Sequence, residues 1–91
     1  MYFVYILTTQ NNTALYVGVP NDLRRRLEEH RNGALGGFSQ KYRVKKLVYF
    51  EEYSSPLDAI SREKQLKGWR RERKIQLIES KNPYWDELYL L

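Results

Sequence analysis

The sequence contains no cysteine and a single histidine, His30, among its 91 residues. The absence of cysteine excludes a disulfide scaffold, a thiol nucleophile and a zinc site with thiolate ligands, and it fits a reducing compartment. No apolar run is long enough to span a bilayer, and the first residues show neither a basic segment nor a small-residue cleavage site. We therefore expect a cytoplasmic protein that does not enter the membrane.

Length and net charge indicate the number of domains and the kind of partner. A chain of 91 residues forms one small domain, and an apolar content of 42% supplies one modest core. Sixteen Lys and Arg residues stand against 11 Asp and Glu residues, which gives a net charge of +5. A small basic domain with 14% aromatic residues suits a polyanionic partner such as nucleic acid.

Three segments of high β-propensity predict strands at about residues 1–8, 14–19 and 45–53. The first two are joined by a short polar link with the turn signal Asn11-Asn12. Such a link favours an antiparallel hairpin, which places Tyr5 and Tyr16 on neighbouring strands.

A helix is predicted at about residues 22–31, after the strand-breaking Pro20. We expect Asn21 to cap it and Asp22 to add negative charge to its first turn. Its apolar face carries Leu23, Leu27 and His30. Arg26 lies at the flank of that face, four residues before His30.

A second helix is predicted to begin at Ser55-Pro56 and to break at Gly68, before a helical run at about residues 70–80. Glu63 shares the buried face of the first of these helices, with Ala59 and Leu66. This carboxylate is either an ion pair or solvated edge, or a metal ligand or catalytic acid at a cleft. Beyond Asn82-Pro83, the tail residues Trp85, Leu88, Tyr89 and Leu90 are expected to dock on the core.

Two tripeptides, Phe3-Val4-Tyr5 and Tyr16-Val17-Gly18, together resemble the paired motifs of the GIY-YIG nuclease superfamily. Arg26, His30 and Glu63 stand where the family places its Arg, its His or Tyr, and its metal-binding Glu. The whole chain is similar to the small, stand-alone bacterial members. The resemblance implies an α+β fold in which a three-stranded antiparallel sheet is flanked by helices.

The same resemblance implies a metal-dependent endonuclease that hydrolyses phosphodiester bonds in DNA, with RNA as a second candidate substrate. Glu63 would bind Mg²⁺ or Mn²⁺, and Arg26 would bind the scissile phosphate. Either Tyr5 or Tyr16 would serve as general base, with Tyr16 preferred, and His30 would orient groups or transfer a proton. Without a sequence-reading motif, we expect cutting directed by nucleic-acid structure, in DNA repair or recombination.

Basic residues form one cluster before the third strand and a second across the two later helices. We expect some of them to contact phosphates that flank the cut: Lys41, Arg43, Lys45, Lys64, Lys67 and Arg70. For Arg71, Arg73 and Lys74, a solvated helix face is as good an interpretation as a phosphate contact.

Two positions depart from the family pattern and favour an alternative hypothesis, a nucleic-acid-binding module with weak or no cleavage. Phe3 replaces the first glycine of the motif, and Val19-Pro20 replaces a polar residue after the second tripeptide. A third hypothesis is a protein-interaction domain that docks through residues 85–91. The sequence leaves the oligomeric state and the need for a partner protein open.

Overall fold

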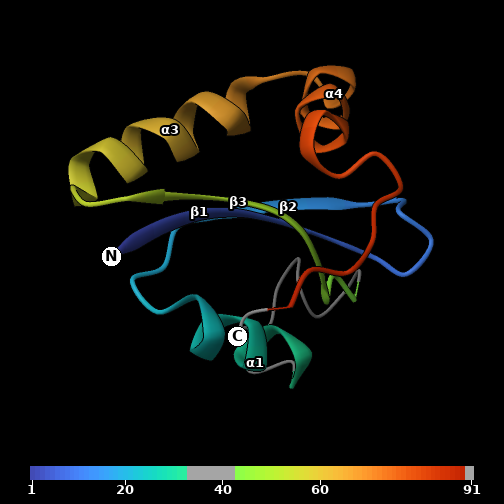
Figure 1. The fold of residues 1–91 in the computed structure, drawn as a ribbon, viewed down its shortest axis with the longest axis horizontal. Coiled ribbons are helices and arrows are strands. Elements are labelled where there is room, and N and C mark those ends of the chain that lie inside the picture. The colour runs from blue at the N-terminus through green and yellow to red at the C-terminus, as the bar shows by residue number, and fades with distance from the viewer. Residues whose placement is uncertain (33–42, 90–91) are drawn as a thin grey trace.

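The computed structural model of the protein describes residues 1–32 and 43–89. Within them, a three-stranded antiparallel sheet lies between helices, with α3 and α4 on one face and α1 on the other (Figure 1). The α+β fold class expected from the sequence is confirmed. Lys41, one of the predicted phosphate contacts, lies outside the described residues.

The sheet has the order β2-β1-β3, so that β1 is its central strand. The strands are β1 (Tyr2–Thr8), β2 (Leu15–Gly18) and β3 (Lys46–Tyr53), close to the predicted segments. The antiparallel hairpin of β1 and β2 is confirmed, with Tyr5 opposite Gly18 and Leu7 opposite Tyr16. As a result, β2 and β3 are the two edge strands.

Three helices occur in the described residues: α1 (Leu23–Arg31), α3 (Pro56–Gly68) and α4 (Arg71–Lys81). The predicted break at Gly68 is confirmed. The predicted cap of α1 at Asn21 is wrong, because Asp22 has the extended backbone of an N-cap residue and its side chain accepts the Arg25 N–H at 3.1 Å. None of these helices is long and apolar enough to cross a bilayer.

Alternating side chains of β1 divide the core between the two faces of the sheet. Val4 and Ile6 pack with the residues of α3 and α4, and Tyr5 and Leu7 pack with those of α1. All four are buried. Tyr5 is therefore a core residue that carries a polar hydroxyl, on the face that α1 covers.

The tail after α4 passes along the β3 edge from one face of the sheet to the other (Figure 1). Trp85 is buried on the side of α3 and α4, and the Leu88 N–H donates to the Leu47 carbonyl at 2.8 Å. Tyr89, also expected to dock, is instead 75% exposed, because the tail has its last core contact at Leu88. Leu90 lies outside the described residues.

Asn82 fixes the start of this tail. Val48 is a bulge residue with no partner across β1, and its carbonyl accepts a hydrogen bond from Asn82 Nδ2 at 3.0 Å. The same Nδ2 donates to the Asp86 carbonyl at 2.9 Å, and Asn82 Oδ1 accepts the Asp86 N–H at 3.0 Å. The Asn82 side chain at the end of α4 thus provides a hydrogen-bond donor for the bulge carbonyl and holds the start of the tail against β3.

Candidate active site

Three ring side chains meet between the β1–β2 hairpin and α1. Tyr5 shares a hydrogen bond of 2.9 Å with His30 Nε2. Tyr16 packs edge-on against the His30 ring, with 4.8 Å between ring centroids, and its centroid lies 6.2 Å from that of Tyr5. The hairpin register and the buried face of α1 bring these three predicted site residues together.

Gly18 makes room for the Tyr5 ring. A Cβ at Gly18 would lie 2.5 Å from Tyr5 Cζ, a separation that real Cβ atoms do not tolerate. The ring of Tyr5 therefore crosses directly over the end of β2. The tripeptide Tyr16-Val17-Gly18 thus supplies one ring of the cluster and the space for another.

The three rings differ in their access to solvent. Tyr5 and His30 are each about 1% exposed, whereas Tyr16 is only partly buried, on the edge strand β2. Burial, and then the neighbouring Tyr16, raises the pKa of Tyr5 above its ordinary value, and the charge of Arg26 offsets only part of this rise. Of the two tyrosines, Tyr16 is the one that a substrate can approach.

Burial also lowers the pKa of His30 to about 4, and the positive charge of Arg26 acts in the same direction. The carboxylate of Glu29 opposes this shift. His30 is therefore neutral at pH 7, with one ring nitrogen as donor and the other as acceptor. In that state it can orient a hydroxyl, but it is not the imidazolium that a general acid at neutral pH requires.

Arg26 lies beside this cluster with its side chain 35% exposed. Its Nε is buried and has no hydrogen-bond partner among the described residues. Glu29 Oε2 lies 3.8 Å from that atom, which is an ion pair but too long for a hydrogen bond. Arg26 thus keeps part of its donor capacity uncommitted at the rim of the ring cluster.

Glu63 lies on α3, on the other face of the sheet. It pairs with Lys67, a lysine that lies near the β2 edge. The Glu63 side chain is 17% exposed, and its carboxylate lies 3.5 Å from Lys67 Nζ. Lys67 lines a shallow groove of about 250 Å³ over β2, together with Tyr16. The groove also includes Leu15, Val17 and Lys74. Residues from both faces of the sheet therefore line one groove at the β2 edge.

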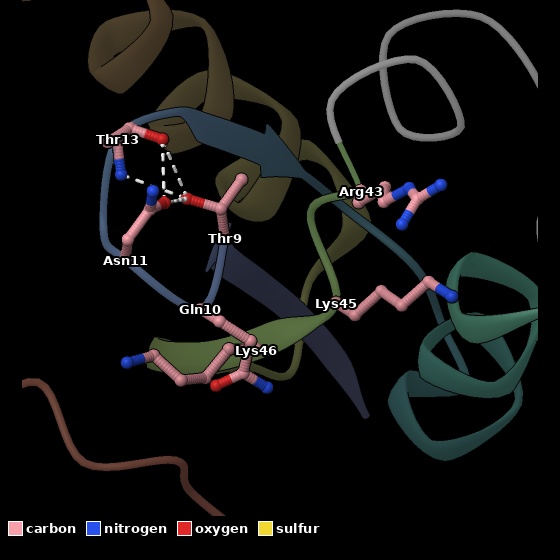
Figure 2. Close-up of a pocket in the computed structure, with 7 residues that line it drawn as sticks. All are labelled: Thr9, Gln10, Asn11, Thr13, Arg43, Lys45 and Lys46. Atoms are coloured by element: carbon pink, nitrogen blue, oxygen red, sulfur yellow. Dashed lines mark hydrogen bonds between the residues drawn. The ribbon is translucent and has the colours of Figure 1, made fainter.

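Two predicted phosphate-binding residues line a basic pocket of about 630 Å³ at the far end of the hairpin (Figure 2). Arg43 and Lys45 extend to the same side of it, and Lys46 extends to the other. Thr9, Asn11 and Thr13 form its polar wall and bond to one another. Lys64 and Arg70 are exposed on the other face of the sheet, and Lys41 lies outside the described residues.

A second polar cluster, on β3, was missed by sequence reasoning. Both carboxylate oxygens of Glu51 accept hydrogen bonds from Arg62, at 2.9 and 3.0 Å. The hydroxyls of Tyr49 and Tyr53 also donate to it, the latter at 2.6 Å. Burial opposes ionisation of Glu51, but these bonds together lower its pKa. The alternation Tyr49-x-Glu51-x-Tyr53 was a usable signal, because it puts all three on one face of the strand.

The two departures from the family pattern both act as packing residues. Phe3 makes an edge-on contact with Phe50, with 6.2 Å between ring centroids. Val19 is partly buried against the core on the side of α3 and α4. Phe3 packs on the same side of the sheet as the ring cluster and Val19 on the opposite side, and neither contributes a polar group to the site.

Comparison with known proteins identifies the family. The family model of the GIY-YIG catalytic domain matches residues 1–76. A UPF0213 protein of Clostridium perfringens is 39% identical over 82 residues, covering 90% of this chain and 87% of that protein. A UPF0213 protein of Staphylococcus epidermidis is 33% identical over 78 residues, covering 86% of this chain and 94% of that one.

The fold of a relative agrees with these matches. The solution NMR structure of a UPF0213 protein from Bacillus halodurans superposes with a TM-score of 0.61 at 26% identity. The match covers 96% of this chain and 93% of that structure. The resemblance seen in the paired tripeptides is thereby confirmed, and the chain belongs to the GIY-YIG family of nuclease-type catalytic domains.

Proposed function

We propose that this chain is a metal-dependent endonuclease that hydrolyses phosphodiester bonds in DNA, directed by nucleic-acid structure and serving repair or recombination. The observation that carries the proposal is the buried Nε of Arg26, which lacks a hydrogen-bond partner among the described residues. Arginine binds phosphate through a planar fork of N–H donors. Nε itself is buried, but the Arg26 side chain is 35% exposed, so a phosphate at the rim of the ring cluster would bind the solvent-facing part of the guanidinium.

Arg26 and Tyr16 are the two groups of the ring-cluster side that would act at the scissile phosphate. Arg26 would bind the scissile phosphate and stabilise the negative charge that builds on it during attack. Tyr16, partly exposed beside it, would orient the attacking water and accept its proton.

Tyr5 and His30 would act as positioning residues. Both are buried, and their 2.9 Å hydrogen bond ties the central strand to α1. Because His30 stays neutral at pH 7, it can hold the Tyr5 hydroxyl without adding charge next to Arg26. The pair would keep Tyr16 and Arg26 at a fixed separation, which a water-activating site needs.

Glu63 is the proposed ligand of Mg²⁺ or Mn²⁺. The described residues contain no group of three or more His, Asp or Glu side chains that could enclose a metal ion. A single carboxylate instead fits a largely hydrated ion that completes its coordination with substrate phosphates. When bound, such an ion acts as a Lewis acid that stabilises the leaving oxygen. Lys67 would have to leave the Glu63 carboxylate as the substrate arrives.

The remaining proposed contacts are to phosphates away from the cut. Arg43 and Lys45 at the hairpin pocket, and Lys64, Lys67 and Arg70 on the other side, would each neutralise backbone charge. Lys41, which lies outside the described residues, stays a prediction of the same kind. Such contacts hold a nucleic acid without reading its bases.

The test is cleavage of labelled single-stranded, duplex, flap and branched DNAs with Mg²⁺, Mn²⁺ or EDTA. Arg26→Lys should reduce the cleavage rate by about 10²-fold, because it removes the fork on the phosphate. Arg25→Lys is the matched control, because Arg25 is an exposed neighbour on the same helix that pairs with Glu29. Glu63→Gln should abolish metal-dependent cutting, and Glu72→Gln on α4 should not.

Cleavage that depends on metal and is lost only in Arg26→Lys and Glu63→Gln would support the enzyme and identify its preferred substrate shape. A chain that binds these DNAs in a salt-dependent way but cuts none of them would instead be a binding module. Equal loss in Arg25→Lys and Arg26→Lys would contradict the role given to Arg26.

A further inference from the structure

We propose that Lys74 of α4 binds a second phosphate of the nucleic acid, next to the one held by Arg26, and so makes α4 a wall of the substrate groove. This inference rests on the proposed function, since it takes the β2 edge as the surface on which the nucleic acid lies. It assigns a role to a residue for which the sequence favoured a phosphate contact and a solvated face equally.

The groove on β2 has the composition of a phosphate site. Its floor is the edge strand, with Leu15 and Val17 beside the ring of Tyr16. Lys67 of α3 and Lys74 of α4 also line it. A backbone phosphate lying in this groove would therefore meet two ammonium groups and the proposed water-binding tyrosine.

Lys74 lacks a local counter-charge. It is partly buried, and no carboxylate lies within 4 Å of its ammonium group among residues 1–32 and 43–89. Burial, followed by the positive charges of Arg71 and Lys67, lowers its pKa. A partly desolvated ammonium between two other cations is a site where an added anion gains free energy.

Three other cations of α3 and α4 are already engaged inside the molecule. Arg62 is bound to Glu51, and Arg73 stacks on the Trp69 ring with its guanidinium carbon 3.9 Å from the centroid. Arg71 donates from Nη2 to the Asn12 carbonyl at 3.1 Å. This last bond fixes the first turn of α4 on the β1–β2 turn, and Lys74 follows it by three residues, at the β2 edge.

A single lysine–phosphate contact has a specific thermodynamic signature. Each phosphate neutralised on duplex DNA steepens the dependence of log K on log salt by about 0.9. We would measure binding of a fluorescein-labelled DNA duplex by anisotropy across a salt series. EDTA in every sample prevents cutting, so the measurement does not depend on catalysis.

Lys74→Gln should reduce the salt slope by about 0.9 and raise the Kd about threefold or more at low salt. Lys81→Gln is the matched control, because it removes one charge from the opposite end of the same helix, where Lys81 lies over the Tyr49 ring at 5.5 Å. Lys74→Arg, which keeps the charge, should retain the slope of the original chain. Equal melting temperatures of Lys74→Gln and Lys74→Arg would show that the fold is intact.

An unchanged slope in Lys74→Gln, or the same reduction in Lys81→Gln, would overturn the inference and leave the proposed nuclease standing. A chain that binds no duplex would overturn it as well. A reduced slope confined to Lys74→Gln in a chain that never cuts DNA would support the phosphate site and contradict the enzyme.

Discussion

Strand β3 and the β1–β2 hairpin carry similar side chains arranged in different ways. On β3, Tyr49 and Tyr53 converge with Arg62 on one carboxylate, Glu51, and every oxygen of that carboxylate is bonded. On the β1–β2 hairpin, two tyrosines gather on His30 beside Arg26, whose Nε has no hydrogen-bond partner in the described residues. The tail covers the β3 edge, and a shallow groove lies over β2.

This contrast separates a structural polar cluster from a functional one. A buried polar network stabilises a fold when all its members are satisfied, and the Glu51 cluster meets that condition. A site that must receive a ligand has to leave donors uncommitted until the ligand arrives. Residue types alone do not distinguish the two; the completeness of their hydrogen bonding does.

The largest effect on folding is expected from breaking the β3 cluster. Arg62→Met should lower the free energy of unfolding by about 3 kcal/mol, because it leaves the Glu51 carboxylate partly buried without its cation. Lys64→Met, at an exposed position two residues later, should change it by less than about 0.5 kcal/mol. Urea unfolding at pH 7 measures both. A loss below about 1 kcal/mol in Arg62→Met would contradict the structural role.

The ion pair of Arg62 with Glu51 shows which contacts the sequence could and could not reveal. The sequence placed it in a basic run, because the pairing of α3 with β3 is a tertiary contact that spacing along the chain does not encode. The meeting of Tyr5 and Tyr16 was predictable, since a short hairpin link leaves little freedom of register. The cap at Asp22 in place of Asn21 shows the usual limit at helix ends, where two adjacent residues have equal capping propensity.

For other parts of the site, the sequence predicted the position of a residue but not its protonation or hydrogen bonding. The face of α1 that carries Leu23, Leu27 and His30 follows from the helical period, and all three are buried. His30 is neutral because it is buried and lies near the charge of Arg26, and it is bonded to Tyr5. Only the packed structure reveals these contacts. The basic cluster made Lys74 a candidate, but the sequence did not place it in the groove, because Lys67 and β2, which line that groove with it, belong to other elements.

The next effect is a pH dependence that arises on the hairpin side. His30 has a pKa of about 4 in the folded chain against 6.5 when unfolded, so the unfolded chain takes up the proton first. The stability due to neutral His30 is therefore fully present above pH 6.5 and is lost as the pH falls from 6.5 to 4. The loss over this window should be roughly 3 kcal/mol, since each pKa unit corresponds to about 1.4 kcal/mol.

Unfolding experiments between pH 7 and pH 4.5 check this dependence. His30→Gln, which cannot titrate, should show a flat profile over that range. Loss of the Glu51 carboxylate contributes only at lower pH, because the pKa of Glu51 is lowered below 4.5. If His30→Gln lost stability with falling pH as steeply as the original chain, another group would be responsible.

A smaller effect is expected from removing the hydroxyl of Tyr5. Tyr5→Phe should lower the free energy of unfolding by about 1 kcal/mol, because His30 Nε2 is then buried without this partner. Tyr2→Phe removes the same hydroxyl from a partly buried residue of the same strand and should change stability by less than about 0.5 kcal/mol. Thermal and urea unfolding at pH 7 compare the two. Equal losses would mean that the bond to His30 contributes nothing specific.

The smallest effect on folding, and the sharpest on function, is expected from Tyr16→Phe. Tyr16 is partly exposed and its ring packs on His30, so the phenylalanine ring keeps that contact. The free energy of unfolding should fall by only about 0.5 kcal/mol. Cleavage of the preferred DNA should fall by about 10²-fold or more, because the water loses its proton acceptor.

The comparison with Tyr5→Phe turns this into a test of which cluster member is catalytic. If Tyr5 only positions its neighbours, Tyr5→Phe should cost more stability than Tyr16→Phe and retain more of the cleavage rate. The salt dependence of DNA binding should be the same in both, because neither change removes a positive charge. A Tyr16→Phe protein that cuts DNA at the original rate would remove Tyr16 from the mechanism and leave water activation to another group near Arg26.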